Sequence, residues 1–426
     1  MNFIALTIGV LGIYPLALFA RKVGWVPVVL SGLIGLLPFL GFDPLTFDFF
    51  QQPYRGESRS LEISVLDLVA AALYFALPKA KQPSPYRASR YTYLAFVLFS
   101  LSVAPIALHS LFSIGNLVRA YFLLGVVTRL AEKPELANAL GRGLALGVVY
   151  SAGLALKQRY LDGMFQVTGG FEHANSLGMA VNLAAPIALA VLLETKFDKL
   201  AMAAITGAAI CVVLALSRGA LMMFGFACGL VILGSLYRQV TRRKIYITLF
   251  LAFGALLVLG KSADSIIERF VTAPAASVAA RHRFEDAAKA MIEDNIFGVG
   301  INQYSYVLEH HGYADEFDMP PVDRDGLAHH IYWLTAAELG WLGLLAYLWL
   351  IATPWWTAVW GALRSKGDVR GAVMLGCAAG MTAMHVHGVA EWAARQSSLM
   401  YIFWTVAGLA AAMNRSVERS KREAAG

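Results

Sequence analysis

Hydrophobic stretches of about 20 residues follow one another along almost the whole chain, separated by short polar segments. Such a stretch is the length that crosses a bilayer as a helix, which satisfies its own backbone hydrogen bonds in lipid. Of the 426 residues, 58% are hydrophobic and 15% are charged, a composition too apolar for a water-exposed surface. The sequence therefore predicts an all-α polytopic membrane protein, with residues 1–426 forming a single integral membrane domain.

The candidate spans can be placed by their apolar runs, although Gly, Pro and Ser interrupt residues 92–130. We therefore expect about 12 or 13 transmembrane helices. The spans are predicted at residues 3–20, 24–41, 62–78, 92–111, 114–130, 139–156, 175–194, 199–216, 219–236, 245–261, 330–352, 371–391 and 397–413.

Lysine and arginine gather in alternate connecting segments, and cationic loops are retained on the cytoplasmic side of a membrane. This bias predicts a multi-pass membrane protein with a cytoplasmic C-terminus. It accounts for the net charge of +7, so no nucleic-acid partner is expected. The segments assigned to the periplasmic side are 42–61, 157–174, 217–218, 262–328 and 391–396.

Residues 262–328 form the longest segment outside the predicted spans and are expected to be a periplasmic loop. Within it, residues 281–294 carry an apolar stripe at helical spacing, which predicts an amphipathic helix on the outer membrane face. The helix should stop at Asn295, before the flexible turn Gly298-Val299-Gly300. The stripe consists of Phe284, Ala287, Ala288, Met291 and Ile292.

Two histidines, His329 and His330, stand at the mouth of the following span. A neutral imidazole accepts a proton near physiological pH, which is what a general base that activates a hydroxyl must do. The alternative is an interfacial histidine that only hydrogen-bonds a lipid head group. On a helix His329 would share a face with Tyr332, while His330 would point about 100° away, so we expect one of the two to face a site.

Three arginines on the same predicted side, Arg218, Arg281 and Arg283, are candidates for binding an anion. Guanidinium groups bind phosphate oxygens in bidentate fashion and keep their charge at any relevant pH, so converging arginines would suit a diphosphate. Alternatively, Arg218 extends to lipid phosphate. Asn175, close to His173 at the start of a span, either caps that helix or contacts a sugar or phosphate.

Glu338 lies inside a predicted span, where an ionisable group needs a partner, and a structural hydrogen bond is the preferred interpretation. Gly340 and Gly343 are expected to permit close helix packing. We expect neither a metal nor a cofactor: His385 and His387 would point apart on a helix, and the sequence has no Gly-rich phosphate loop after a strand and no Asp-x-Asp pair in an outer loop.

Taken in order, several motifs between about residues 170 and 350 resemble the O-antigen ligase and O-antigen polymerase superfamily. They are Ser217-Arg218-Gly219, Arg281 at the start of an outer helix, Gly298-Val299-Gly300, and His329-His330-Ile331-Tyr332 leading to Glu338-x-Gly340-x-x-Gly343.

The resemblance implies a metal-independent, inverting glycosyltransferase without a cofactor. It would move a glycan from undecaprenyl diphosphate to an acceptor at the periplasmic face. His329 matches the essential histidine of the family, and Arg218 and Arg281 match its two functional arginines. The family usually has Asn where this chain has His330, and Glu285 replaces an aromatic residue, so Arg283 is a rival to Arg281.

Within that family, the first hypothesis is an O-antigen ligase of lipopolysaccharide biosynthesis. Its partners would be an undecaprenyl-diphosphate-linked O-antigen donor, a lipid A-core acceptor and the surrounding membrane lipids. A polymerase usually has two large outer loops, and an O-linked protein glycosyltransferase a longer C-terminal extension. A polysaccharide or lipid transporter is the non-enzymatic alternative, but it would place paired charges near mid-membrane.

Overall fold

The computed structural model describes residues 3–41, 45–79, 82–130, 133–195, 197–271 and 275–425. With one exception, at residues 92–111, each predicted span corresponds to one helix. These are α1 (Phe3–Lys22), α2 (Trp25–Leu36, extended by the 3-10 turn η1, Leu37–Phe39), α3 (Val65–Ala76), α4 (Arg87–Phe99), α5 (Ala107–Arg129), α6 (Pro134–Tyr160), α7 (Ala174–Glu194), α8 (Lys199–Leu214), α9 (Arg218–Arg238), α10 (Arg242–Val271), α14 (Ile331–Arg364), α15 (Val369–His387) and α16 (Ser397–Ala425).

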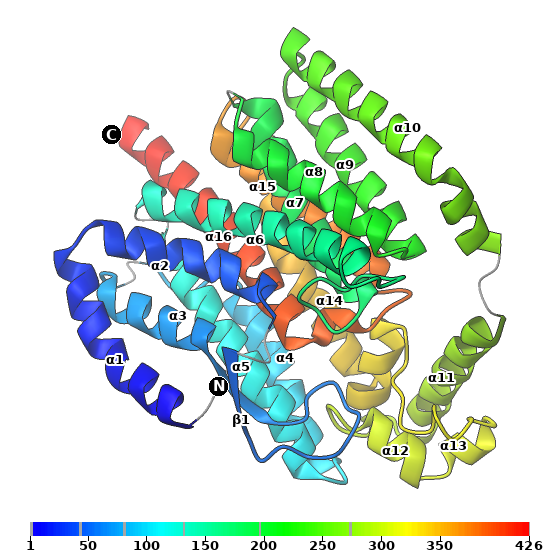
Figure 1. Ribbon diagram of the computed structural model, residues 1–426. Coiled ribbons are helices and arrows are strands. Elements are labelled where there is room, and N and C mark those ends of the chain that lie inside the picture. Colours follow the sequence, from blue (N-terminus) through cyan, green and yellow to red (C-terminus); the bar gives the residue numbers. More distant parts are fainter. Residues whose placement is uncertain are drawn as a thin grey trace.

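The all-α polytopic membrane class is thereby confirmed (Figure 1). Among the described residues, eight helices are long and apolar enough to cross a membrane, namely α1, α5, α6, α7, α9, α14, α15 and α16. Three shorter apolar helices, at Trp25–Phe39, Val65–Ala76 and Lys199–Leu214, accompany them.

Two local features differ from the prediction. The span predicted at 92–111 is broken, because α4 ends at Phe99 and the 3-10 turn η3 (Ser100–Ser102) and Pro105 precede α5. The segment 42–61 and the residues after it contain an antiparallel hairpin that was not predicted, formed by β1 (Thr46–Phe49) and β2 (Leu61–Ser64). Strands of four residues carry too little alternation to be recognised from sequence.

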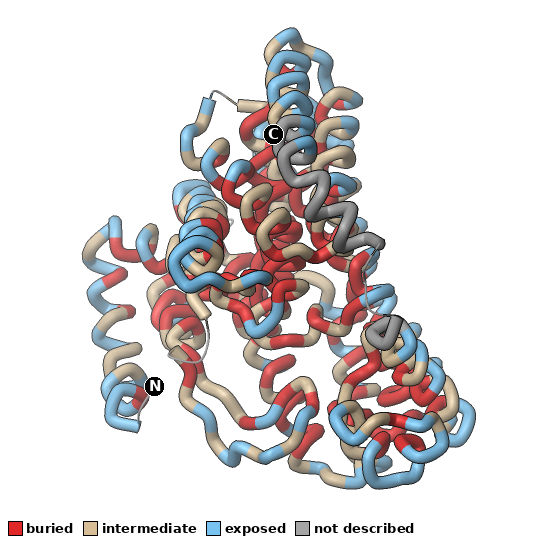
Figure 2. The backbone as a smooth tube through the Cα atoms, turned by 45° about the vertical axis from the view of Figure 1, so that its right-hand side comes forward, coloured by how far each residue is buried: buried red, intermediate tan, exposed pale blue. Residues whose placement is uncertain are grey.

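Helix α7 is the centre of the bundle, and 94% of its most apolar window is buried by the surrounding helices. It packs on α6, α8, α9 and α15. Close approach to α15 depends on two glycines, because a Cβ at Gly376 or Gly380 would overlap the α7 backbone at Ile187 or Leu183. The buried residues consequently run through the middle of the bundle in Figure 2.

A smaller body with its own core consists of α11 (Ala275–Asp294), α12 (Tyr304–His310) and α13 (Tyr313–Glu316). In Figure 2 its buried residues form a separate group at the lower right. Residues 281–294, where an amphipathic helix was predicted, form the second part of α11. Its apolar stripe is buried among protein residues, and α11 packs on α14.

Helix α14 is kinked at Gly340, whose φ of 69° and ψ of 177° are not helical. The kink lets another chain segment approach: a Cβ at Gly340 would overlap the carbonyl oxygen of Ile296. The N–H groups of Val299 and Gly300 donate at 2.9 Å to the carbonyls of Ala337 and Glu338. Gly340 therefore permits close packing, as expected, but of an irregular segment rather than a second helix.

Candidate functional site

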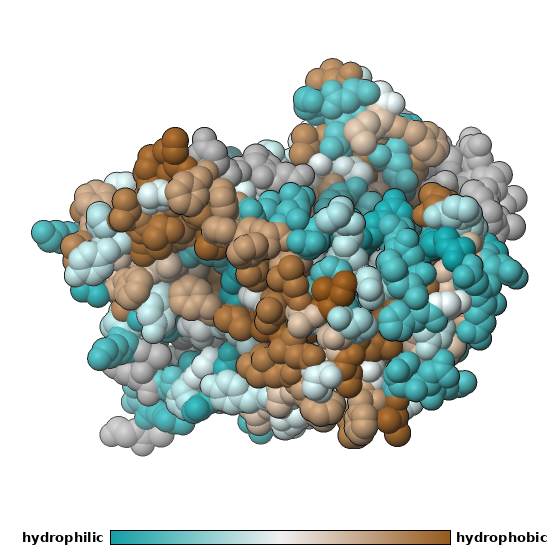
Figure 3. Space-filling view, turned by 90° about the horizontal axis from the view of Figure 1, so that it is seen from below, coloured by the Kyte–Doolittle hydropathy of each residue, from teal (hydrophilic) through white to brown (hydrophobic). Residues whose placement is uncertain are grey.

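Four loops meet at the end of the bundle that carries the hairpin and α11–α13, here called the loop end and drawn at the bottom of Figure 1. They enclose a cavity of about 680 Å³, the His329 cavity. An adjoining cavity of about 610 Å³, the hairpin cavity, shares part of its wall. Both volumes are in the range of small-molecule sites. Seen from this end, hydrophilic residues gather beside a broad hydrophobic patch (Figure 3).

The residues that line the two cavities come from segments predicted to lie on one side of the membrane and from the adjoining ends of predicted spans, and the structure brings them to one end of the bundle. The His329 cavity is lined by Arg55, Arg59, Gln166, Thr168, Glu172, His173, Ala174, Asn175, Ser176, Phe284, Val322, Asp323, Asp325, Gly326, Leu327, His329, Glu391, Trp392, Ala393 and Gln396.

The carboxylate of Glu391 is the centre of the site. Its side chain is only 5% exposed, yet both oxygens have partners. Arg281 Nη2 donates to Oε1 at 3.1 Å, and Asn175 Nδ2 donates to the same oxygen. His329 Nδ1 lies 3.4 Å from Oε2. One buried carboxylate thus joins three residues that are far apart in the sequence.

The electrostatics of Glu391 favour its ionised form. Burial disfavours a charged carboxylate, but the hydrogen bond from His329 and the charges of His329 and Arg281 outweigh it, and the pKa of Glu391 is lowered. An ionised carboxylate accepts hydrogen bonds only, so His329 Nδ1 must carry the proton that it shares with Glu391. The other ring nitrogen, Nε2, is then left as the basic atom.

The two adjacent histidines have different roles in the structure. His329 lines the cavity and its side chain is 32% exposed. His330 is the N-cap of α14, and its Nδ1 accepts a hydrogen bond from the backbone N–H of Trp333 at 3.3 Å. Burial lowers the pKa of His330, which keeps the ring neutral and able to accept. The geometry places His329, not His330, at the carboxylate.

The expectation that His329 and Tyr332 share a helical face is wrong, because α14 begins only at Ile331 and His329 lies outside it. The Tyr332 hydroxyl donates to the carbonyl of His385 at 2.8 Å, and its side chain does not line the His329 cavity. Tyr332 therefore braces α14 against α15 and lies apart from the carboxylate.

The structure also separates the rival arginines. Arg281 contacts Glu391 and is 40% exposed, so part of its guanidinium is open to a ligand. Arg283 makes no hydrogen bond or ion pair to Glu391 or His329, and its Nε is buried without a partner among the described residues. Two residues apart on α11, their side chains point to roughly opposite sides.

Arg218 begins α9, directly after the N-cap Ser217. The next residue, Gly219, lies against the end of α15, where a Cβ would stand 2.5 Å from Nε2 of the buried His387. The charges of Glu391 and Arg281 act on His387 in turn. The start of α9 therefore joins the group around Glu391, although Arg218 does not line the His329 cavity.

At the start of α7, His173 is the N-cap residue and Asn175 follows inside the helix. The Asn175 side chain does not cap the helix but binds Glu391, so the capping interpretation is wrong. Both residues line the His329 cavity.

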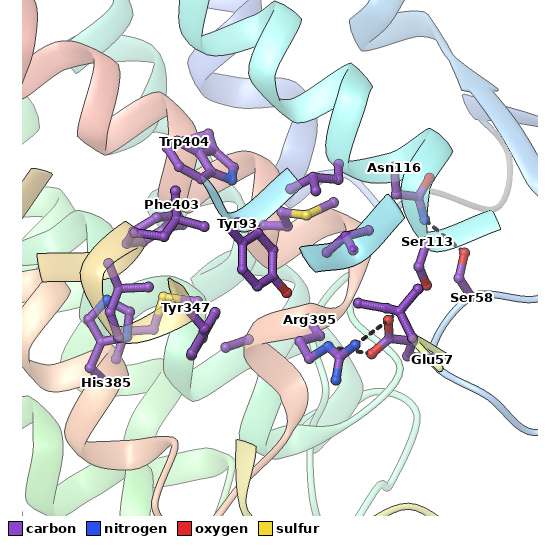
Figure 4. Close-up of a pocket in the computed structure, with 18 residues that line it drawn as sticks. Glu57, Ser58, Tyr93, Ser113, Asn116, Tyr347, His385, Arg395, Phe403 and Trp404 are labelled. Atoms are coloured by element: carbon purple, nitrogen blue, oxygen red, sulfur yellow. Dashed lines mark hydrogen bonds and ion pairs between the residues drawn. The ribbon is translucent and has the colours of Figure 1, made fainter. Parts of the chain in front are cut away.

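On the inner side of residues 391–396, Arg395 forms a second buried cluster. Its Nε lies 2.6 Å from Glu57 Oε2 and its Nη2 lies 2.7 Å from Glu338 Oε2. Figure 4 shows Arg395 reaching Glu57 at one end of a small inner cavity, with His385 at the other end. Glu338 also accepts from the N–H of Tyr304, which confirms the predicted structural hydrogen bond.

Sequence reasoning missed Glu391. The available signal was its isolation, since it is the one acidic residue between Asp368 and Glu418 and it lies in a short loop between two spans. Arg55 and Arg59 of the hairpin loop were missed as well. Among the described residues, no group of three His, Cys, Asp or Glu side chains is arranged to hold a metal ion.

A comparison with protein families matches residues 202–348 to a model described as O-Antigen ligase. The match contains Arg218, Arg281 and His329 and ends before Glu391. No curated protein matches the chain. Over residues 202–348, the family match supports the resemblance that the sequence motifs indicate.

Proposed function

Because residues 202–348 belong to the O-antigen ligase superfamily, we propose that this protein is an O-antigen ligase, a glycosyltransferase of lipopolysaccharide biosynthesis. It transfers the O-antigen glycan from undecaprenyl diphosphate to the lipid A-core acceptor at the periplasmic face of the inner membrane. The observation that supports this best is the pairing of His329 with the buried Glu391 carboxylate, 3.4 Å apart, at the wall of a polar cavity.

In the proposed reaction, His329 is the general base. Its Nδ1–H donates to Glu391, and Nε2 takes the proton of an acceptor sugar hydroxyl as that oxygen attacks the anomeric carbon of the donor. The bond between the anomeric carbon and the diphosphate oxygen breaks, and the configuration inverts. Glu391 holds the ring in one tautomer and stabilises the imidazolium that forms, as the buried carboxylate does in a Ser-His-Asp triad.

The leaving diphosphate is assigned to Arg281 and Arg218. Fixed cations stabilise charge that develops on a leaving group, and they do so strongly where water is partly excluded. Arg281 contacts the Glu391 carboxylate without lining the His329 cavity. We therefore assign the cavity to the acceptor and the arginine side to the lipid-linked donor.

The direct test is His329→Ala, with His330→Ala as the matched control for an adjacent histidine. Transfer of purified undecaprenyl-diphosphate-linked glycan to lipid A-core should fall to background with His329→Ala, because the base is lost. With His330→Ala it should persist, because that ring caps α14. Normal transfer by the His329 variant would refute the base.

A strain that lacks the gene separates the related activities. Loss of a ligase leaves lipopolysaccharide with the core only, while the polymer accumulates on its carrier. Loss of a polymerase would instead leave cores that carry a single repeat, and loss of a protein glycosyltransferase would leave lipopolysaccharide unchanged. Either of these last two outcomes would replace the ligase assignment with its alternative.

A further inference from the structure

The turn formed by residues 391–396 presents different side chains to its two sides. Trp392 is the N-cap and Gln396 the C-cap of a 3-10 turn, η5 (Ala393–Arg395). Arg395 points inward to Glu57 and Glu338. Glu391, Trp392 and Gln396 line the His329 cavity. The buried ion pairs of Arg395 thus fix the turn on its inner side, while the side chains on the outer side of the turn face the cavity.

Gln396 carries an unused hydrogen-bonding group at this face. The residue is only 9% exposed, and its Oε1 accepts from Ser176 Oγ at 2.6 Å. Its Nε2 is buried with no partner among the described residues. If the amide is turned over, the Ser176 hydroxyl accepts instead and the oxygen is the unpaired atom. A buried polar atom without a partner is costly, and a polar ligand in the cavity would supply one.

Trp392 lies next to Glu391 and lines both the His329 cavity and the hairpin cavity, as does Gln396. Its ring is half-buried. An aromatic ring offers an apolar face to the C–H groups of a sugar and a polar edge to its hydroxyls. Planar polar side chains shared by the two cavities, those of Arg55, Arg59, Glu172 and Gln396, are suited to bind the hydroxyls in the ring plane.

We propose that Trp392 and Gln396 form the subsite for the acceptor sugar, with the sugar ring stacked on the indole and a ring substituent bound by the Gln396 amide. This inference rests on the proposed transferase function. The acceptor, rather than the donor glycan, is assigned here because the cavity side of Glu391 carries His329, whereas Arg281 lies outside the cavity wall.

The kinetic test uses Trp392→Ala and Trp392→Phe, with Trp356→Ala as a control for the loss of an exposed tryptophan outside both cavities. Trp392→Ala should raise KM for lipid A-core about ten-fold, because a stacked aromatic contact of this size is lost. KM for the lipid-linked donor should stay unchanged. Trp392→Phe should restore most of the acceptor affinity. A rise in donor KM, or an unchanged acceptor KM, would overturn the assignment.

A binding measurement separates this inference from the proposed function. The full-length protein in detergent is titrated calorimetrically with the delipidated core oligosaccharide. Wild type and the control variant Trp356→Ala should bind it equally, and Trp392→Ala and Gln396→Met should bind it at least about five-fold more weakly. Equal binding by all four proteins would disprove the subsite. Weaker binding by the Trp392 and Gln396 variants, in a protein that transfers no glycan, would uphold the sugar subsite and refute the ligase.

Discussion

Two carboxylate–arginine clusters lie on opposite sides of the same short turn, and they differ in the sign of the charge that is in excess. At Glu391, one carboxylate faces Arg281, His329 and the amide of Asn175. At Arg395, one guanidinium faces two carboxylates, Glu57 and Glu338. The first cluster opens to a large cavity, whereas the side chains of the second are 9% exposed or less.

The sign of the excess charge influences whether the carboxyl groups of each cluster are protonated. The pKa of Glu391 is lowered, since the cationic partners outweigh its burial. Burial raises the pKa of Glu57, and the nearby Glu338 raises it further, against the opposing effect of Arg395. A carboxylate that stays charged at the edge of a cavity is suited to orient a base. A guanidinium shared by two buried acids is suited to join the hairpin loop, α14 and the turn.

The largest expected effect is a loss of stability when the inner cluster, the ion pairs of Arg395 with Glu57 and Glu338, is broken. Arg395→Met leaves Glu57 and Glu338 buried without their counter-ion, and should lower the free energy of unfolding by about 3–5 kcal/mol. Thermal unfolding of the purified protein in detergent measures this. Arg55→Met removes an ion pair to Asp325 in which Arg55 is 56% exposed, and should change stability by less than about 1 kcal/mol. Equal losses in the two variants would remove the distinction between buried and open clusters.

Substitution in the outer cluster, formed by Glu391 with Arg281, His329 and Asn175, should lower activity and leave stability largely unchanged. Glu391→Gln keeps the shape of the side chain but removes the charge that stabilises a protonated His329, and should lower kcat by about 100-fold or more. The protein should still fold, because Arg281 and His329 are partly exposed and can be solvated. Transfer assays and thermal unfolding on the same preparation check both points. A large loss of stability with normal kcat would make Glu391 a structural residue like Arg395.

A smaller effect should distinguish the two arginines of α11. Arg281→Lys replaces a bidentate group by a point charge, and should raise KM for the lipid-linked donor by about ten-fold. Arg283→Lys should leave it nearly unchanged, because that side chain does not reach Glu391. Donor titrations at saturating acceptor give both values. The reverse order of effects would reassign the diphosphate to Arg283.

The smallest effects should appear in the dependence of stability on pH, with opposite signs for the two clusters. The lowered pKa of Glu391 stabilises the fold above the ordinary carboxyl value of about 4.3, and this stabilisation is lost as the pH falls through the folded-state pKa. The raised pKa of Glu57 acts in reverse, so its contribution is present below about 4.3 and is lost as the pH rises through the raised pKa.

Profiles of the unfolding temperature against pH should show these opposite signs. Glu57→Gln should reduce the loss of stability between about pH 4 and pH 7, and Glu391→Gln should reduce the loss below about pH 4. The same slope in both variants would contradict the opposite charge balance of the clusters.

Much of the fold follows from composition and periodicity. Apart from the broken run at residues 92–111, each predicted span became one helix, because a chain in lipid has few other ways to satisfy its backbone hydrogen bonds. Periodicity marked the apolar stripe of α11, but it does not show whether protein or lipid covers such a face, and in the structure protein residues cover it. The β1–β2 hairpin was missed because its strands are four residues long.

The candidate site was only partly predictable. His329 and Arg281 were selected by residue type and position, and the structure joins them through Glu391. Tyr332 was misplaced because helical geometry was extended back to His329, two residues before α14 begins. Trp392 and Gln396 gave no signal, because a half-buried tryptophan in a short loop of a membrane protein has many ordinary uses.

The sequence alone determined that the chain is a bundle of membrane helices. It also marked one histidine and several arginines as candidates for function, because placing such groups at a membrane is energetically unfavourable. The length of an apolar segment and the unfavourable free energy of a charged residue in lipid are local properties, so both can be recognised from local sequence. Only the tertiary structure decided that Glu391 lies between His329 and Arg281, and that Arg395 faces the other way. Those contacts join residues more than 50 positions apart, and packing of whole helices, not any local pattern, brings them together.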